Sequence, residues 1–96
     1  MSAVLVIAKL NFTDLPRYRQ YQAAFPAIFA GSGGEILVAD ESPATLSGDV
    51  ADKIVVMRFP DAETAQTFLT SPDYLRISED RDAGANTHAW IAKAFS

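Results

Sequence analysis

The chain contains no cysteine, which excludes disulfide bonds and thiolate chemistry. It has a single histidine, too few soft ligands for a structural zinc site, which needs about four. No apolar run approaches the ~20 residues of a membrane span, and the first ten residues lack the basic leader and cleavage site of a signal peptide. We therefore expect a soluble, cytoplasmic protein with no metal site and no cofactor.

Positive charge is also scarce. Eight Lys and Arg residues are dispersed among twelve Asp and Glu residues, which gives a net charge of −4. Proteins that bind nucleic acids need clustered cations to replace the counterions of the phosphates. Neither a nucleic acid nor an anionic membrane surface is expected as a partner.

The composition is that of one globular domain over residues 1–96, with 49% hydrophobic and 21% charged residues. Its predicted strands are apolar at odd and even positions alike. Because a strand turns alternate side chains to opposite faces, this pattern requires apolar cover above and below the sheet. The four strand segments are 3–10, 35–39, 53–59 and 87–95.

Two substantial helices are predicted between these strands. The first follows a cap at Thr13 or Asp14 and carries a buried stripe; Pro26 predicts a kink or break near Phe25. The second begins at Ala62 after Phe59-Pro60-Asp61, and Ser71-Pro72 restarts the chain as a further helical turn. The residues predicted to point inward are Leu15, Tyr18, Gln22, Phe25 and Phe29 in the first helix, and Ala62, Ala65, Phe68, Leu69, Tyr74, Leu75 and Ile77 after it.

The resulting order is β-α-β-β-α-β, the split motif of ferredoxin-like α+β folds, with an antiparallel sheet in the order 4-1-3-2. Right-handed crossovers place both helices on one face of the sheet. The other face is bare, and its Val, Leu, Ile and Met side chains form the kind of apolar patch that marks an interface. A second copy of the chain is the expected partner, so we predict a homodimer.

The run from Phe59 to Arg81, together with Gly33-Gly34 and the first-helix segment RYRQYQ, resembles the domain of unknown function family 1330. Its most specific pieces are the Phe-Pro-Asp and Ser-Pro-Asp-Tyr segments and Arg81, seven residues beyond that tyrosine. The resemblance implies a dimeric α/β barrel, in which two ferredoxin-like protomers pack sheet to sheet. That superfamily includes small monooxygenases, isomerases and haem-degrading proteins, but the family implies no catalytic residue for this chain.

His88 is the best catalytic candidate, because histidine titrates near neutrality without help. Antiparallel pairing of the last strand with the first brings it near Lys9, whose charge would favour a neutral ring suited to act as a base. Trp90 shares its strand face and can stack on a planar ligand. The alternatives are a surface histidine without a task and a tryptophan that fills the core or an interface.

Arg58 interrupts an apolar strand and can pair with Glu35 or clamp a ligand carboxylate. Tyr18 and Tyr21 lie three residues apart on one helix surface, as core residues or with one hydroxyl turned into a pocket. Arg81 is expected to form local ion pairs with Asp80 and Asp82 or to cap the short helix, and the alternative is a contact across the dimer.

The function that these features favour is binding of a small apolar or aromatic metabolite, in a pocket between sheet and helices or at the dimer interface. The sequence does not decide whether the protein is an enzyme; if it is, His88 would transfer a proton without a cofactor while Arg58 or Lys9 holds an acidic substituent. The alternative is a non-catalytic dimeric module for binding or assembly, with a filled interior. A third hypothesis is regulation through a protein partner at the loop 41–52.

Overall fold

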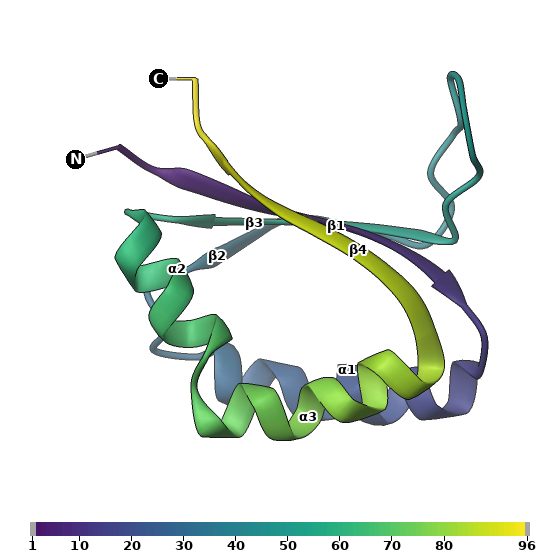
Figure 1. Ribbon diagram of the computed structural model, residues 1–96, viewed down its shortest axis with the longest axis horizontal. Coiled ribbons are helices and arrows are strands. Elements are labelled where there is room, and N and C mark those ends of the chain that lie inside the picture. Colours follow the sequence, from purple (N-terminus) through teal and green to yellow (C-terminus); the bar gives the residue numbers. More distant parts are fainter. Residues whose placement is uncertain (1, 96) are drawn as a thin grey trace.

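The computed structural model describes residues 2–95 and confirms an α+β protomer (Figure 1). The second half of the motif contains two helices in place of one. The elements are β1 (Val4–Phe12), α1 (Leu15–Phe29), β2 (Glu35–Asp40), β3 (Lys53–Phe59), α2 (Ala62–Leu69), α3 (Pro72–Gly84) and β4 (Ala85–Lys93).

The four strands form one antiparallel sheet in the order β2-β3-β1-β4, which is the predicted order. Lys9 of β1 lies opposite His88 of β4, and Glu35 of β2 lies opposite Arg58 of β3, as the sequence predicted. This register fixes which side chains share a face, because a shift of one residue would move every side chain of a strand to the other face.

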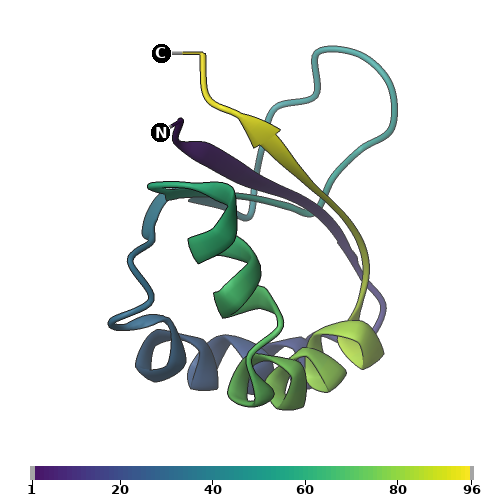
Figure 2. The same cartoon turned by 60° about the vertical axis from the view of Figure 1, so that its left-hand side comes forward.

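All three helices lie on one side of the sheet (Figures 1 and 2). In Figure 1, α1 and α3 form a layer below the sheet, α2 descends from the sheet to that layer at one end, and β4 curves down to meet α3 at the other. The helices begin where their caps predict, because the side chains of Asp14, Asp61 and Ser71 accept hydrogen bonds from backbone N–H groups three residues on.

Two expectations about the helices are corrected: a break of the first helix at Pro26, and a single turn after Ser71. Pro26 does not end α1, which continues to Phe29; its last turn is closed by the N–H of Ala30, which donates to the carbonyl of Pro26 at 3.0 Å. The rings of Phe25 and Phe29 stack at 5.0 Å and hold this turn against the core. The restart at Ser71 is also longer than one turn: α3 has 13 residues, since it packs along α1.

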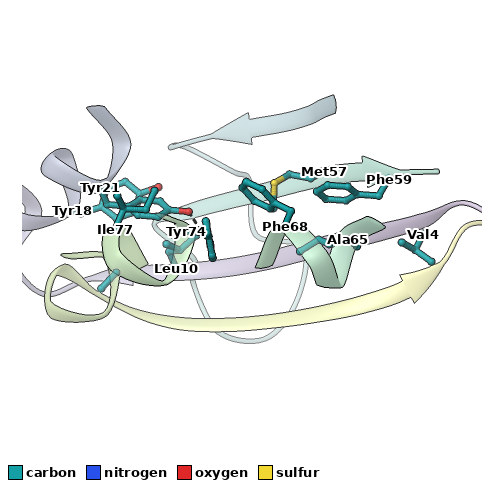
Figure 3. Packing of buried hydrophobic residues seen from close by; sticks show 12 residues of the cluster. Val4, Leu10, Tyr18, Tyr21, Met57, Phe59, Ala65, Phe68, Tyr74 and Ile77 are labelled. Atoms are coloured by element: carbon teal, nitrogen blue, oxygen red, sulfur yellow. Dashed lines mark hydrogen bonds between the residues drawn. The ribbon is translucent and has the colours of Figure 1, made fainter. Parts of the chain in front are cut away.

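The core lies between the sheet and the helices and is rich in aromatic rings (Figure 3). Phe59 is fully buried, and Phe68 of α2 packs against it with ring centroids 5.9 Å apart. The ring centroids of Phe68 and Tyr74 are 4.8 Å apart. Three residues expected to point inward are exposed, because each lies at the margin of its helix's buried stripe: Leu15, Ala62 and Leu75.

α3 passes into β4 without a connecting loop, and Gly84 at this junction touches the start of α1. Its carbonyl accepts hydrogen bonds from the N–H groups of Thr13 (2.9 Å) and Asp14 (3.1 Å). A Cβ added to Gly84 would lie 2.4 Å from the backbone nitrogen of Tyr18. The two chain segments therefore approach more closely than any side chain permits.

The loop 41–52 projects from the sheet on the side away from the helices (Figure 1). Its base is fixed to β1 by two hydrogen bonds of 2.9 Å. Asn11 Nδ2 donates to the carbonyl of Val50, and the N–H of Asp52 donates to the carbonyl of Leu10. At its tip Leu46 is 99% exposed. The loop thus extends past the sheet face that no helix covers.

Candidate functional site

The two faces of the sheet offer two different candidate sites. Val6, Ala8 and Leu10 of β1 point toward the helices, whereas the alternate residues Leu5, Ile7 and Lys9 point to the uncovered side, which we call the open face. The helix side holds a cavity, and the open face holds an apolar surface.

The cavity has a volume of about 480 Å³ and lies between the sheet and the layer formed by α1 and α3. Its walls are mostly apolar, from Val6 and Ala8 of β1 to Phe25 of α1 and Leu69 of α2. Exposed side chains at its rim, such as Leu75 and Ile91, show that it opens to solvent. Pockets of small-molecule binding proteins have about this size and character, ~300–1,000 Å³.

A chain of polar groups lies in this apolar wall. Arg81 Nη1 donates to the hydroxyl of Tyr74 at 2.7 Å, and that hydroxyl lies 3.1 Å from the hydroxyl of Tyr21. Arg81 Nε and Nη2 donate to Asp82 on the outside of the helix, which holds the guanidinium in place. All three residues Tyr21, Tyr74 and Arg81 line the cavity.

The pKa values of Tyr21 and Arg81 are both raised by their surroundings. Burial, followed by the neighbouring Tyr74, raises the pKa of Tyr21 far above its ordinary value, so its hydroxyl stays protonated. Burial by itself would lower the pKa of Arg81, but Tyr74 and Asp82 outweigh it and the pKa is raised. The cavity wall therefore contains a permanent cation that donates to a tyrosine hydroxyl.

A second cation lies in the cavity wall at the start of β3. The side chain of Lys53 is 5% exposed; its Nζ lies 3.3 Å from Glu41 and 5.0 Å from the centroid of the Tyr18 ring. Arg19 donates to both carboxylate oxygens of Glu41, at 2.6 and 2.7 Å. Glu41 thus joins the β2–β3 loop to α1 and β3.

We expect the stabilisation that Glu41 provides to disappear as the pH falls from about 4.5 to about 2. The hydrogen bonds from Arg19, helped by Lys53, lower the pKa of Glu41 from 4.5 to about 2. A carboxyl whose folded pKa is lowered stabilises the protein above its unfolded pKa, and this contribution is lost as the pH falls through the folded pKa. Urea unfolding of the wild type and of Glu41→Gln should show a difference in the free energy of unfolding that shrinks over this range. An equal difference at both ends of the range would contradict the ion-pair origin.

Two hydroxyl groups complete the polar lining. Ser78 Oγ donates to the carbonyl of Leu75 at 2.8 Å, so it is satisfied within α3. Thr87 Oγ1 on β4 is buried and has no hydrogen-bond partner in residues 2–95. Buried polar groups are nearly always paired, so the Thr87 hydroxyl is an exception among the residues of the cavity wall.

The structure separates the residues that the sequence singled out. Tyr18 and Tyr21 line the cavity, and Trp90 borders it. By their register, Lys9, His88 and Arg58 lie on the open face, as does the Trp90 side chain, whose ring is parallel to that of His88 at 6.5 Å. The candidates for proton transfer and for holding an acid are therefore on the opposite side of the sheet from the tyrosines.

The sequence analysis did not identify Lys53 and Thr87 as cavity residues, placed Tyr74 in the core without a polar role, and assigned Arg81 to local ion pairs or a helix cap. The ion pair with Asp82 exists, at 2.9 Å, while Asp80 pairs with Arg17. The seven-residue spacing of Tyr74 and Arg81 was the available signal, because residues two helical turns apart share one face.

The open face has an apolar row across all four strands, formed by Val38, Val56, Ile7 and Trp90 in neighbouring register positions. Charged residues flank the row on both sides. Glu35 and Arg58 lie at one side with a 3.9 Å ion pair, while Asp40 and Lys9 lie at the other. These four charges cancel, although the whole chain carries −4.

The topology and the one-sided helices define a ferredoxin-like α+β domain with a cavity between its layers. The chain belongs to the family described as domain of unknown function (DUF1330), whose model matches residues 3–95. No curated protein sequence matches it at a significant level. Within residues 2–95, no helix has the length and hydropathy to span a membrane, and no cluster of three or more His, Cys, Asp or Glu residues is arranged to hold a metal ion.

Solved structures with the same fold share little sequence with this chain. RPA0582, a protein of unknown function from Rhodopseudomonas palustris, has a TM-score of 0.84 at 14% identity, over 99% of this chain and 84% of that one. A dimeric protein of unknown function with a ferredoxin-like fold from Bacteroides fragilis has a TM-score of 0.68 at 12% identity, over 98% of both chains. SnoaB, a cofactor-independent oxygenase from Streptomyces nogalater, has a TM-score of 0.68 at 15% identity, over 100% and 96%. At these identities the likeness establishes the fold alone.

Proposed function

We propose that the protein binds a small apolar or aromatic molecule in the cavity between its sheet and its helices. The observation that carries this proposal is the 480 Å³ volume with apolar walls, into which a few polar groups of α1, α3 and β4 converge. Apolar walls provide affinity by excluding water, and a few fixed polar groups orient the ligand. This volume favours ligand binding over the alternative of a pure assembly module with a filled interior.

We further propose that two protomers associate through their open faces. The apolar row of Val38, Val56, Ile7 and Trp90 favours burial against a surface of the same kind. Its flanking charges sum to zero, so two copies of a chain of net charge −4 meet there without repulsion between the faces. A two-fold interface must complement itself, and a balanced face satisfies that condition. The dimeric relative from Bacteroides fragilis has the same fold.

Catalysis is a second candidate function, favoured by one comparison and by the chemistry of His88. SnoaB is a cofactor-independent oxygenase with this fold. In the present chain His88 lies beside Lys9 on the open face, so a proton transfer by His88 would take place at the dimer interface and not in the cavity. Its catalytic role stays a prediction, and ligand binding in the cavity does not depend on it.

Ligand binding is tested with two probes that share one ring system, naphthalene and 2-naphthoate. At a probe concentration ten times its Kd, wild-type protein should gain about 1.4 kcal/mol and melt roughly 5–10 °C higher. Ala8→Phe adds a ring to the sheet wall of the cavity and should abolish the shift, as measured by differential scanning fluorimetry.

Ala62→Phe is the matched control, because it adds the same ring at an exposed position at the start of α2. It should keep the full shift. If neither probe moves the melting temperature of the wild type, or if Ala8→Phe still responds, the cavity is not the binding site.

A further inference from the structure

We infer that Tyr21, Tyr74 and Arg81 form a receptor for an anionic oxygen, so that the cavity selects flat apolar molecules bearing a carboxylate or phenolate group. This inference rests on the proposed function, since it names the class of ligand for the same cavity. Two observations support it: the number of hydrogen-bond donors and acceptors among the three side chains, and the charged residues that line the cavity.

One hydroxyl proton of the Tyr21–Tyr74 pair has no acceptor among the described residues. Arg81 Nη1 donates to Tyr74, and the two tyrosine hydroxyls share a single contact of 3.1 Å. That contact uses one of the two hydroxyl protons, whichever tyrosine donates it. The other proton has no acceptor within residues 2–95, so one O–H of the pair is free to donate to a ligand in the cavity.

The guanidinium strengthens this free donor. A hydroxyl oxygen that accepts from a cation becomes a better donor, and hydrogen bonds in a chain polarise one another. Asp82 holds Nε and Nη2 of Arg81, so the direction of Nη1 is fixed before any ligand arrives. Figure 3 shows Tyr21 and Tyr74 with their hydroxyls toward one another between α1 and α3. Donors fixed in this way stabilise negative charge on a bound oxygen.

The charged side chains that line the cavity also favour an anionic ligand. Among the described residues that line the cavity there are two cations, Lys53 and Arg81, and no carboxylate. This is a marked departure in a chain with twelve acids and eight bases. A neutral hydrocarbon would leave the free tyrosine proton without an acceptor, whereas a carboxylate or phenolate oxygen would accept from it beside these cations.

The experiment compares the Kd of 2-naphthoate with that of naphthalene by isothermal titration calorimetry. Wild-type protein should bind the carboxylate more tightly. Tyr74→Phe and Arg81→Met should each reduce that preference roughly tenfold to a hundredfold and leave the Kd of naphthalene nearly unchanged. Tyr18→Phe is the matched control: Tyr18 lines the same cavity but its hydroxyl is outside the chain of Tyr21, Tyr74 and Arg81, so the preference should persist.

A spectroscopic measurement separates charge recognition from a change in packing. 4-Nitrophenol changes its absorption on ionisation, so its bound pKa is read directly. Binding to the wild type should lower that pKa, and Arg81→Met should abolish the shift while circular dichroism verifies the fold.

Equal affinity for the two naphthalene probes, or a preference that survives Tyr74→Phe and Arg81→Met, would overturn the inference and leave cavity binding intact. Failure of both probes to bind would overturn the proposed function itself.

Discussion

Gly84→Ala is expected to lower the free energy of unfolding by roughly 3–5 kcal/mol, since overpacking and lost hydrogen bonds add together. The new Cβ would lie 2.4 Å from the nitrogen of Tyr18 and 2.8 Å from the carbonyl oxygen of Asp14, and both are backbone atoms that cannot rotate away. Separating the segments would also stretch the bonds from Thr13 and Asp14 to the Gly84 carbonyl. Urea denaturation followed by circular dichroism measures the loss.

Gly48→Ala gives the comparison for this prediction. Gly48 has a φ of +84° in the loop 41–52, and a Cβ there would meet no atom within 4 Å. The variant should therefore lose only about 1–2 kcal/mol of its free energy of unfolding, which is the cost of placing alanine at a positive φ. If the two variants were equally stable, the close approach at Gly84 would not limit the packing of α1 against the α3–β4 junction.

Val56→Glu is expected to convert the proposed dimer into a monomer of 10.4 kDa and to weaken self-association roughly a hundredfold or more. Val56 lies at the centre of the open face, opposite Ile7 on one side and Val38 on the other. In a two-fold interface the substitution introduces two like charges among apolar side chains, and both must lose their hydration. Sedimentation equilibrium over a range of protein concentrations measures the association constant.

Thr67→Glu makes the same change of charge at an exposed position of α2, away from the open face, and should leave the association unchanged. A wild-type protein that remains a folded monomer at micromolar concentration would refute the dimer. A Val56→Glu variant that still dimerises would place the interface elsewhere on the protomer.

The fold followed from the sequence because its local signals agree. Strands apolar at successive positions, and the caps Asp14, Asp61 and Ser71, specify the elements and their order. The length of α3 did not follow. The segment 72–84 is strongly polar and its inward-facing residues are few, so its helical extent depends on contacts with α1 such as the Arg17–Asp80 ion pair at 2.9 Å. Such contacts between distant parts of the chain leave little trace in a local pattern.

The site was predicted in part. Pairing of β1 with β4 predicted that His88 would lie beside Lys9, and it does. Their side of the sheet was not predictable, because strands that are apolar on both faces give no indication of which face the helices cover. Tyr21 was recognised as a cavity candidate, but its hydrogen-bond partner Tyr74 lies 53 residues away along the chain. Only the packing of α3 on α1 brings the two hydroxyls together.

Because no linker separates α3 from β4, an insertion or deletion at this junction would change the register of β4. One residue inserted after Gly84 would advance β4 by one position and exchange its two faces. Thr87 would then turn outward and the neighbouring His88 inward, which would alter the cavity and the open face in one step. Insertions and deletions should therefore accumulate between β2 and β3, where twelve residues from Glu41 to Asp52 connect the strands. The two connections at this end of the sheet should therefore tolerate changes of length to different degrees.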